Sequence, residues 1–149
     1  MRLAPMLFVS SAAVALIGAC GSSSGSSAPA CVANLSTACD PLYSPPTYPT
    51  IFAMTFQPTC ATGIGTCHTA DAAQGGLSFA DEQQSYEELL GMNGANVRVV
   101  PGDPACSLLM ERLESTDPTF HMPKGPNSLP AAALCAVAQW IANGATNDP

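Results

Sequence analysis

Hydrophobic residues recur at helical spacing in short segments of this chain, separated by loops rich in glycine and proline. The pattern is clearest over about residues 130–143, where apolar side chains follow one another at i, i+3, i+4 and i+7. These side chains are Leu134, Val137, Ala138 and Ile141. Ser128 precedes the segment as a candidate cap, and Gly144 follows it as a stop signal. The spacing predicts a helix from about Pro130 to Asn143.

Three further helices are expected upstream. The first begins near Pro49 and stops before Pro58, with Ile51, Met54 and Thr55 on one face and Phe52 and Phe56 on an adjoining face. The second is capped by Asp81 and ends at Gly91, and the third starts at Asp103-Pro104, where proline needs no hydrogen-bond partner. No strand pattern is long enough for a sheet. The predicted fold class is therefore all-α, a small domain of about four short helices with long loops.

The N-terminus predicts export. Arg2 is followed by an apolar run from Leu3 to Ile17 and then by small residues up to Cys20, an order typical of a secretory signal and too short for a comfortable membrane span. Ile17-Gly18-Ala19-Cys20 resembles the lipobox of bacterial lipoproteins, which implies lipidation of Cys20. Gly21 in place of aspartate resembles the sorting pattern of outer-membrane lipoproteins. An ordinary signal with an incidental Cys20 thiol is the alternative.

Composition divides the remaining chain. Residues 21–30 are almost all glycine, serine and alanine and predict a flexible tether, and the proline-rich stretch up to residue 49 predicts an irregular arm over the domain surface. The expected organisation is a signal peptide over 1–19, the lipidated cysteine, linker and arm over 20–49, and a helical domain over 50–146.

The charge of the chain is acidic, with four Lys and Arg against eleven Asp and Glu. This balance disfavours nucleic acid as a partner and favours a basic protein surface. The sequence contains no Ser/His/Asp arrangement, phosphate-binding glycine loop or paired catalytic carboxylates, and Glu87, Glu88, Glu111 and Glu114 are expected on solvated helix faces. We therefore expect neither an enzyme nor a small-molecule substrate.

Candidate chemistry is concentrated in Cys60-Ala-Thr-Gly-Ile-Gly-Thr-Cys67-His68. Two cysteines followed by a histidine resemble the C-x-x-C-H signature of c-type haem attachment, although six residues separate the cysteines here. In that signature both thiols bond to the porphyrin and the imidazole binds the iron, which makes His68 a candidate ligand. Met122 is the preferred candidate for the opposite axial position, because a thioether is soft and uncharged; the neighbouring His121 is expected to be an exposed loop residue.

Taken in order, these motifs resemble a known family. They are Ile51-Phe52, Cys60, Cys67-His68, Gly75-Gly76-Leu77, Pro101-Gly102-Asp103-Pro104, Met122-Pro123 and Trp140-Ile141 up to Ala145. The set is similar to the cytochrome c-like domain family of planctomycete type and covers about residues 50–146. The resemblance implies a class I cytochrome c fold, one haem thioether-linked to Cys60 and Cys67, and axial ligation by His68 and Met122. It implies electron transfer with a redox partner protein.

The wide spacing of Cys60 and Cys67 leaves a second interpretation open. Exported cysteines tend to be oxidised, so these two can instead close a disulfide in a haem-free structural or interaction lipoprotein with the same fold. Zinc binding by Cys60, Cys67, His68 and His121 is a weaker alternative, because their spacing matches no common zinc site. Of the other cysteines besides Cys20, we expect Cys31 to pair with Cys39 and Cys106 to pair with Cys135.

Overall fold

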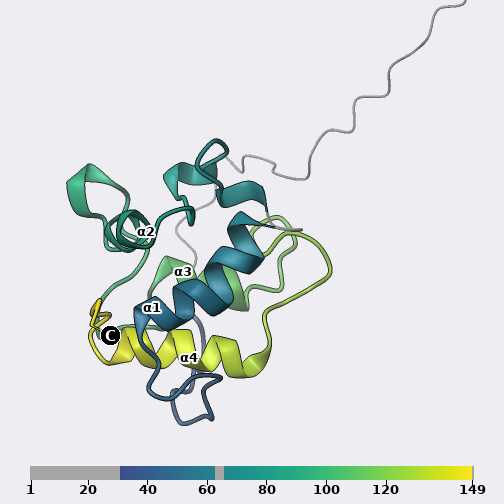
Figure 1. Ribbon diagram of the computed structural model, residues 1–149. Coiled ribbons are helices and arrows are strands. Elements are labelled where there is room, and N and C mark those ends of the chain that lie inside the picture. The colour runs from purple at the N-terminus through teal and green to yellow at the C-terminus, as the bar shows by residue number, and fades with distance from the viewer. Residues whose placement is uncertain (1–30, 63–65, 149) are drawn as a thin grey trace, which may run out of the picture.

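A computed structural model describes residues 31–62 and 66–148 of the chain (Figure 1). Its α-helices are α1 (Tyr48–Ile51), α2 (Glu82–Leu89), α3 (Leu108–Glu114) and α4 (Ala131–Ala142), and the described residues form no strand. Long loops and short helical turns connect these elements. The all-α prediction of about four short helices with long loops is confirmed.

The core forms where α4 packs against both α1 and α3 (Figure 1). α4 is buried along most of its length because its apolar residues recur at helical spacing. Tyr48 of α1 is fully buried, and the centroids of the Trp140 and Tyr86 rings lie 5.1 Å and 5.2 Å from the centroid of its ring. Its hydroxyl lies 2.6 Å from Ser85 Oγ, so the buried polar group of Tyr48 is satisfied by α2.

The helix that starts at α1 continues further than the sequence predicts. A π-helical segment, η1 (Phe52–Ala61), follows α1 without a break and contains Pro58. Proline lacks the N–H of one helical hydrogen bond, but the segment remains helical while it buries Phe56 and Ala61. The prediction that the helix stops before Pro58 is therefore wrong, and Cys60 lies in the last turn of η1.

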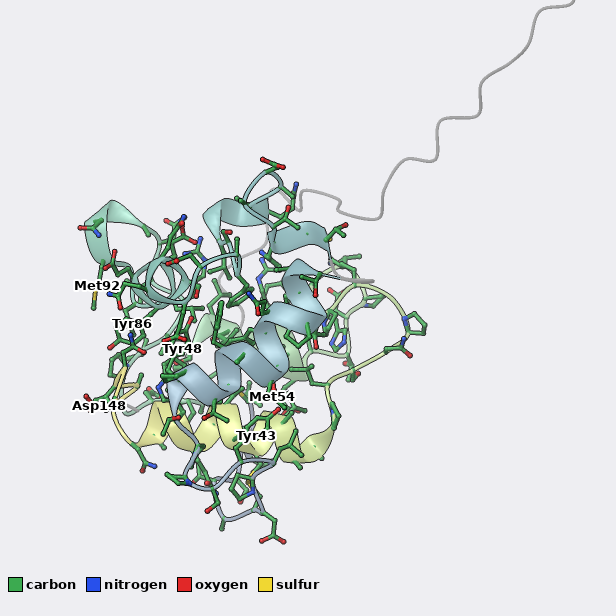
Figure 2. All side chains as sticks on the ribbon, viewed as in Figure 1. Tyr43, Tyr48, Met54, Tyr86, Met92 and Asp148 are labelled. Carbon is green, nitrogen blue, oxygen red and sulfur yellow. A yellow bond between two sulfur atoms is a disulfide. The ribbon has the colours of Figure 1, made fainter. Side chains whose placement is uncertain are left out.

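One side chain of this helix does not lie where the pattern placed it. Ile51 and Thr55 are buried, but Met54 is 62% exposed (Figure 2). The buried stripe therefore passes through Phe52 and Phe56 and leaves Met54 in solvent.

The observed ends of α2 agree with the predicted ends, but the observed start of α3 does not agree with the predicted start. Asp81 caps α2 by accepting the Gln84 N–H at 2.8 Å. Asp103 instead caps a turn, accepting the Cys106 N–H at 3.1 Å, and α3 starts after Ser107. The Ser107 hydroxyl accepts the Val100 N–H and donates to the Asp103 carbonyl, which keeps residues 100–107 in a turn. α4 begins after Pro130 without a side-chain cap, so Ser128 is not its cap.

The arm from Cys31 to Thr47 is fastened to the helical domain at several points. Disulfides join Cys31 to Cys106 and Cys39 to Cys135, across 75 and 96 residues of sequence. The four cysteines are paired, but the expected pairs, Cys31 with Cys39 and Cys106 with Cys135, are wrong. Cys31 pairs with Cys106 in the turn before α3 and Cys39 pairs with Cys135 of α4, so each cysteine of the arm meets a distant cysteine rather than its neighbour in sequence.

Hydrogen bonds also hold the arm against α4. Gln139 of α4 donates to the carbonyls of Thr37 and Cys39, and the Leu42 N–H donates to Ala132 O at 2.8 Å. The predicted signal peptide, Cys20 and the linker up to residue 30 lie outside the described residues. Within the described ranges, no helix has the length and apolar character needed to cross a membrane.

Candidate functional site

His68 lies in a short 3-10 turn, η2 (Thr66–His68), and its ring orientation is determined by the backbone of Leu77. Nδ1 of His68 is 2.9 Å from the Leu77 carbonyl oxygen. A carbonyl oxygen only accepts hydrogen bonds, so Nδ1 carries the proton and donates it. Nε2 therefore keeps its lone pair, and no described residue forms a hydrogen bond with it. This is the tautomer that a metal-binding imidazole requires.

The surroundings of His68 keep its ring neutral. Burial lowers the pKa of His68, and the nearby charges of Arg98 and Arg112 lower it further, although the bond to Leu77 opposes them. The ring of Phe79 meets the imidazole edge to face at 5.7 Å, and the Phe79 N–H donates to the His68 carbonyl at 2.8 Å. His68 is thus a neutral, half-buried base whose main chain and ring are both held in place.

The two cysteines of the motif differ in state. Cys60 carries a free thiol at the end of η1, and burial raises its pKa to about 12, so the sulfur is protonated at neutral pH. Cys67 is disulfide-bonded, and Cys60 is not its partner. The structure therefore contains no Cys60–Cys67 disulfide. η1 and η2 nevertheless contact each other, so the two motif cysteines come from adjoining elements.

Met122 lies in the loop that follows α3. Its N–H donates to the Arg112 carbonyl at 2.9 Å, and its half-buried side chain packs against the hydrophobic core. The Arg112 guanidinium lies over the ring of Phe120 at 4.3 Å from the centroid and donates to the Phe120 carbonyl. Arg112 therefore anchors this loop to α3, and its charge also reaches His68. Arg112 thus acts on both candidate ligands, through its charge on His68 and through its carbonyl on the Met122 N–H.

The ring of His121 is held by hydrogen bonds to two other residues. Its Nδ1 is 2.8 Å from the Ser115 carbonyl and its Nε2 is 3.4 Å from Ser128 Oγ, so both ring nitrogens have partners. The side chain is half-buried, contrary to the expectation of an exposed residue. The sulfur of Met122 forms no hydrogen bond with any described residue. This difference favours Met122 over His121 as a ligand.

These residues fit the axial ligands of a haem better than they fit its two thioether bonds. A neutral imidazole with an open Nε2 and a half-buried thioether are a common axial pair in electron-carrying cytochromes. Cys60 offers a thiol, but a sulfur held in a disulfide cannot also bond to a porphyrin, so Cys67 does not fit as the structure stands. Among residues 31–62 and 66–148, no group of three or more His, Cys, Asp or Glu side chains is arranged to hold a metal ion.

A cavity of about 300 Å³ lies away from these residues. It opens between the arm and α4, next to the Cys39–Cys135 disulfide, and its walls include Leu35, Glu114, Leu134 and Ala138. None of the candidate ligands lines it.

Comparison with known proteins finds a family match for one segment of this domain. Residues 65–125 match the family model described as planctomycete cytochrome C, and the match supports a cytochrome c-like domain. The matched segment includes Cys67, His68 and Met122 and begins after Cys60. No curated protein and no solved structure matches the chain.

The sequence did not indicate which groups hold His68. Gly75-Gly76-Leu77 belonged to the family pattern, but the role of the Leu77 carbonyl depends on its approach to the ring. Glu88 was expected to be a solvated surface residue. It instead accepts the Ser78 N–H at 2.7 Å, and Arg98 is 8% exposed among backbone carbonyls.

Proposed function

We propose that this protein is an exported, lipid-anchored electron carrier that binds one haem c, whose iron His68 and Met122 would hold. The observation that carries the proposal is the hydrogen bond from His68 Nδ1 to the Leu77 carbonyl, which leaves Nε2 open. The family match over residues 65–125 supports it, because that segment contains both proposed ligands.

When bound, the haem would supply a one-electron iron couple. The chain's own residues keep that site from rearranging, since His68 is held through both its ring and its carbonyl. Bound to that iron, the thioether of Met122 would act as an uncharged donor and would raise the reduction potential relative to harder ligands. Apolar neighbours such as Phe79, which is 2% exposed, exclude water from the side of the His68 imidazole that they cover.

Surface charge supports a protein partner. With a net charge of −7 and a pI of about 4.3, the chain favours encounter with a basic redox protein. Lipidation at Cys20 would keep the domain at the periplasmic side or surface of a bacterial membrane, most consistently the outer membrane.

The decisive experiment is expression of the full chain in a host that attaches haem c. We expect a mature protein whose mass includes one haem and whose spectrum has a Soret band. His68→Ala should abolish the band, and His121→Ala, which changes the histidine bonded to Ser115 and Ser128, should retain it. A colourless protein without added mass would reject the proposal.

The cysteine variants test how the haem is attached. Cys60→Ser and Cys67→Ser each remove one candidate thioether, and covalent haem that survives denaturation in one variant only would identify the bonding sulfur. Attachment requires the Cys67 sulfur to be released from its disulfide, or the bond to form at Cys60 alone.

The disulfide state of Cys67 favours a second candidate function. A haem-free, disulfide-stabilised structural or interaction lipoprotein with a cytochrome c-like fold would keep that bond permanently. In this case the periplasmic protein would be colourless, and thiol alkylation without reduction would label Cys60 only in the unfolded protein.

A further inference from the structure

The segment that holds His68 is itself held from its other side by α2. Leu77 is extended, and in an extended chain the backbone groups of successive residues point to opposite sides. The Leu77 carbonyl and the Phe79 N–H both bond to His68. The N–H of Ser78, between them, points away and donates to Glu88 Oε2 at 2.7 Å.

Arg98 fastens the turn that precedes this segment. Its Nη2 donates to the Gly75 carbonyl at 2.5 Å, and its Nη1 donates to the carbonyls of Glu88 and Asn96 at 2.7 Å and 2.9 Å. Gly75 and Gly76 have φ of +68° and +72°, the left-handed region in which other residues are strained. The guanidinium therefore connects this glycine turn to the C-terminal end of α2.

We propose that Glu88 and Arg98 are positioning residues for His68. They hold residues 75–78 against α2, so that the Leu77 carbonyl stays against the imidazole and keeps its proton on Nδ1. The Glu88 carboxylate is itself oriented, because Gln84 Nε2 donates to its Oε1 at 2.7 Å. The binding of a haem iron at the open Nε2 of His68 rests on the proposed function. The positioning of the His68 ring by Glu88 and Arg98 does not depend on it.

The size of the effect follows from one hydrogen bond. A neutral imidazole can carry its proton on either nitrogen, and the acceptor beside the ring decides which form is populated. A hydrogen bond contributes about 1 kcal/mol net, so a displaced Leu77 carbonyl should lower the ratio of the Nδ1–H to the Nε2–H form about fivefold.

The test uses the full chain without haem, labelled with ¹⁵N-histidine. The chain has two histidines, and His121→Gln assigns their signals. Glu88→Asp keeps the charge but withdraws the carboxylate from Ser78, and we expect the tautomer ratio of His68 to fall about fivefold. Glu88→Gln retains an oxygen acceptor at full length and should restore the ratio, and Arg98→Lys, which loses the fork of donors, should lower it.

Glu87→Asp is the matched control. Glu87 neighbours Glu88 on α2, but its carboxylate accepts from Gln83 and Asn93 rather than from the His68 segment. An unchanged ratio in folded Glu88→Asp and Arg98→Lys would overturn the inference, as would an equal change in Glu87→Asp. A colourless protein that nevertheless shows the Glu88 effect would reject the proposed function and leave this inference standing.

Discussion

His68 and Met122 differ from the other candidate ligands in what remains available on the side chain. The Leu77 carbonyl occupies one nitrogen of His68 and leaves the other open, whereas both nitrogens of His121 have partners. Met122 is half-buried beside the core, and its loop is anchored through Arg112. At the scale of single residues, hydrogen bonding therefore distinguishes the two proposed ligands from His121.

In haem-loaded protein, Met122→Ala should leave haem attached but lower its reduction potential, because the thioether ligand raises it. Redox titration and electron paramagnetic resonance would measure the potential and the axial ligand. Met54→Ala is the matched control, since Met54 is 62% exposed. An unchanged spectrum in Met122→Ala would exclude Met122 as the ligand.

The Cys60 thiol predicts a loss of stability at alkaline pH in the haem-free protein. Its pKa is raised by burial from 9.0 to about 12, so the unfolded chain releases the thiol proton first as pH rises. The stabilisation is complete below pH 9 and is lost between pH 9 and about 12, at up to about 1.4 kcal/mol per pH unit.

Urea unfolding of the protein and of Cys60→Ala across this range would measure the effect. Burial also raises the pKa of Tyr48, so the difference between the two proteins isolates the cysteine. Equal slopes for both proteins would contradict the prediction.

At the scale of elements, the local signals predicted the helices better than their ends. The caps of α2 and the apolar periodicity of α4 act over neighbouring residues, and both helices form where expected. Pro58 and Asp103 are also local signals, but burial of η1 and the Ser107 hydrogen bonds outweigh them. Element ends are thus decided where tertiary contacts compete with capping residues.

The turn after α2 offers a test at this scale. A Cβ at Gly91 would lie 2.6 Å from Val97 Cγ2 and 3.0 Å from the Val97 backbone, in addition to the strain of φ +72°. Gly94 has φ +81° but no neighbour within 4 Å of a Cβ. We expect Gly94→Ala to destabilise the protein by about 1 kcal/mol from strain alone, and Gly91→Ala by roughly 2 kcal/mol or more. Denaturant unfolding would measure both; equal losses would show that the contact with Val97 relaxes freely.

At the scale of the whole molecule, two long-range disulfides attach the arm to the helical domain. The Cys31–Cys106 and Cys39–Cys135 bonds close loops of 75 and 96 residues. Such bonds stabilise a fold by restricting its unfolded chain, and more so for longer loops. The arm is thus part of the folded unit, held also by Gln139 and by backbone hydrogen bonds.

Replacing both cysteines of either pair by serine should lower the free energy of unfolding by about 4 to 5 kcal/mol. Thermal unfolding with and without reductant would measure the loss. Peptide mapping under non-reducing conditions should recover Cys31 linked to Cys106 and Cys39 linked to Cys135. Recovery of a Cys31–Cys39 peptide would contradict this connectivity.

The sequence by itself determined the helical class of the domain, the likeness of the segment with Cys67 and His68 to the planctomycete cytochrome C family, and four of the cysteines that form disulfides. These features depend on residue periodicity and on motifs that lie close together in the chain. Only the tertiary structure decided which cysteines pair, that Met54 faces solvent, and that Glu88 and Arg98 support the backbone around His68. Each of these features depends on which distant segments of the chain come into contact. The Leu77 carbonyl likewise selects the His68 tautomer only because the folded chain brings it against the imidazole ring.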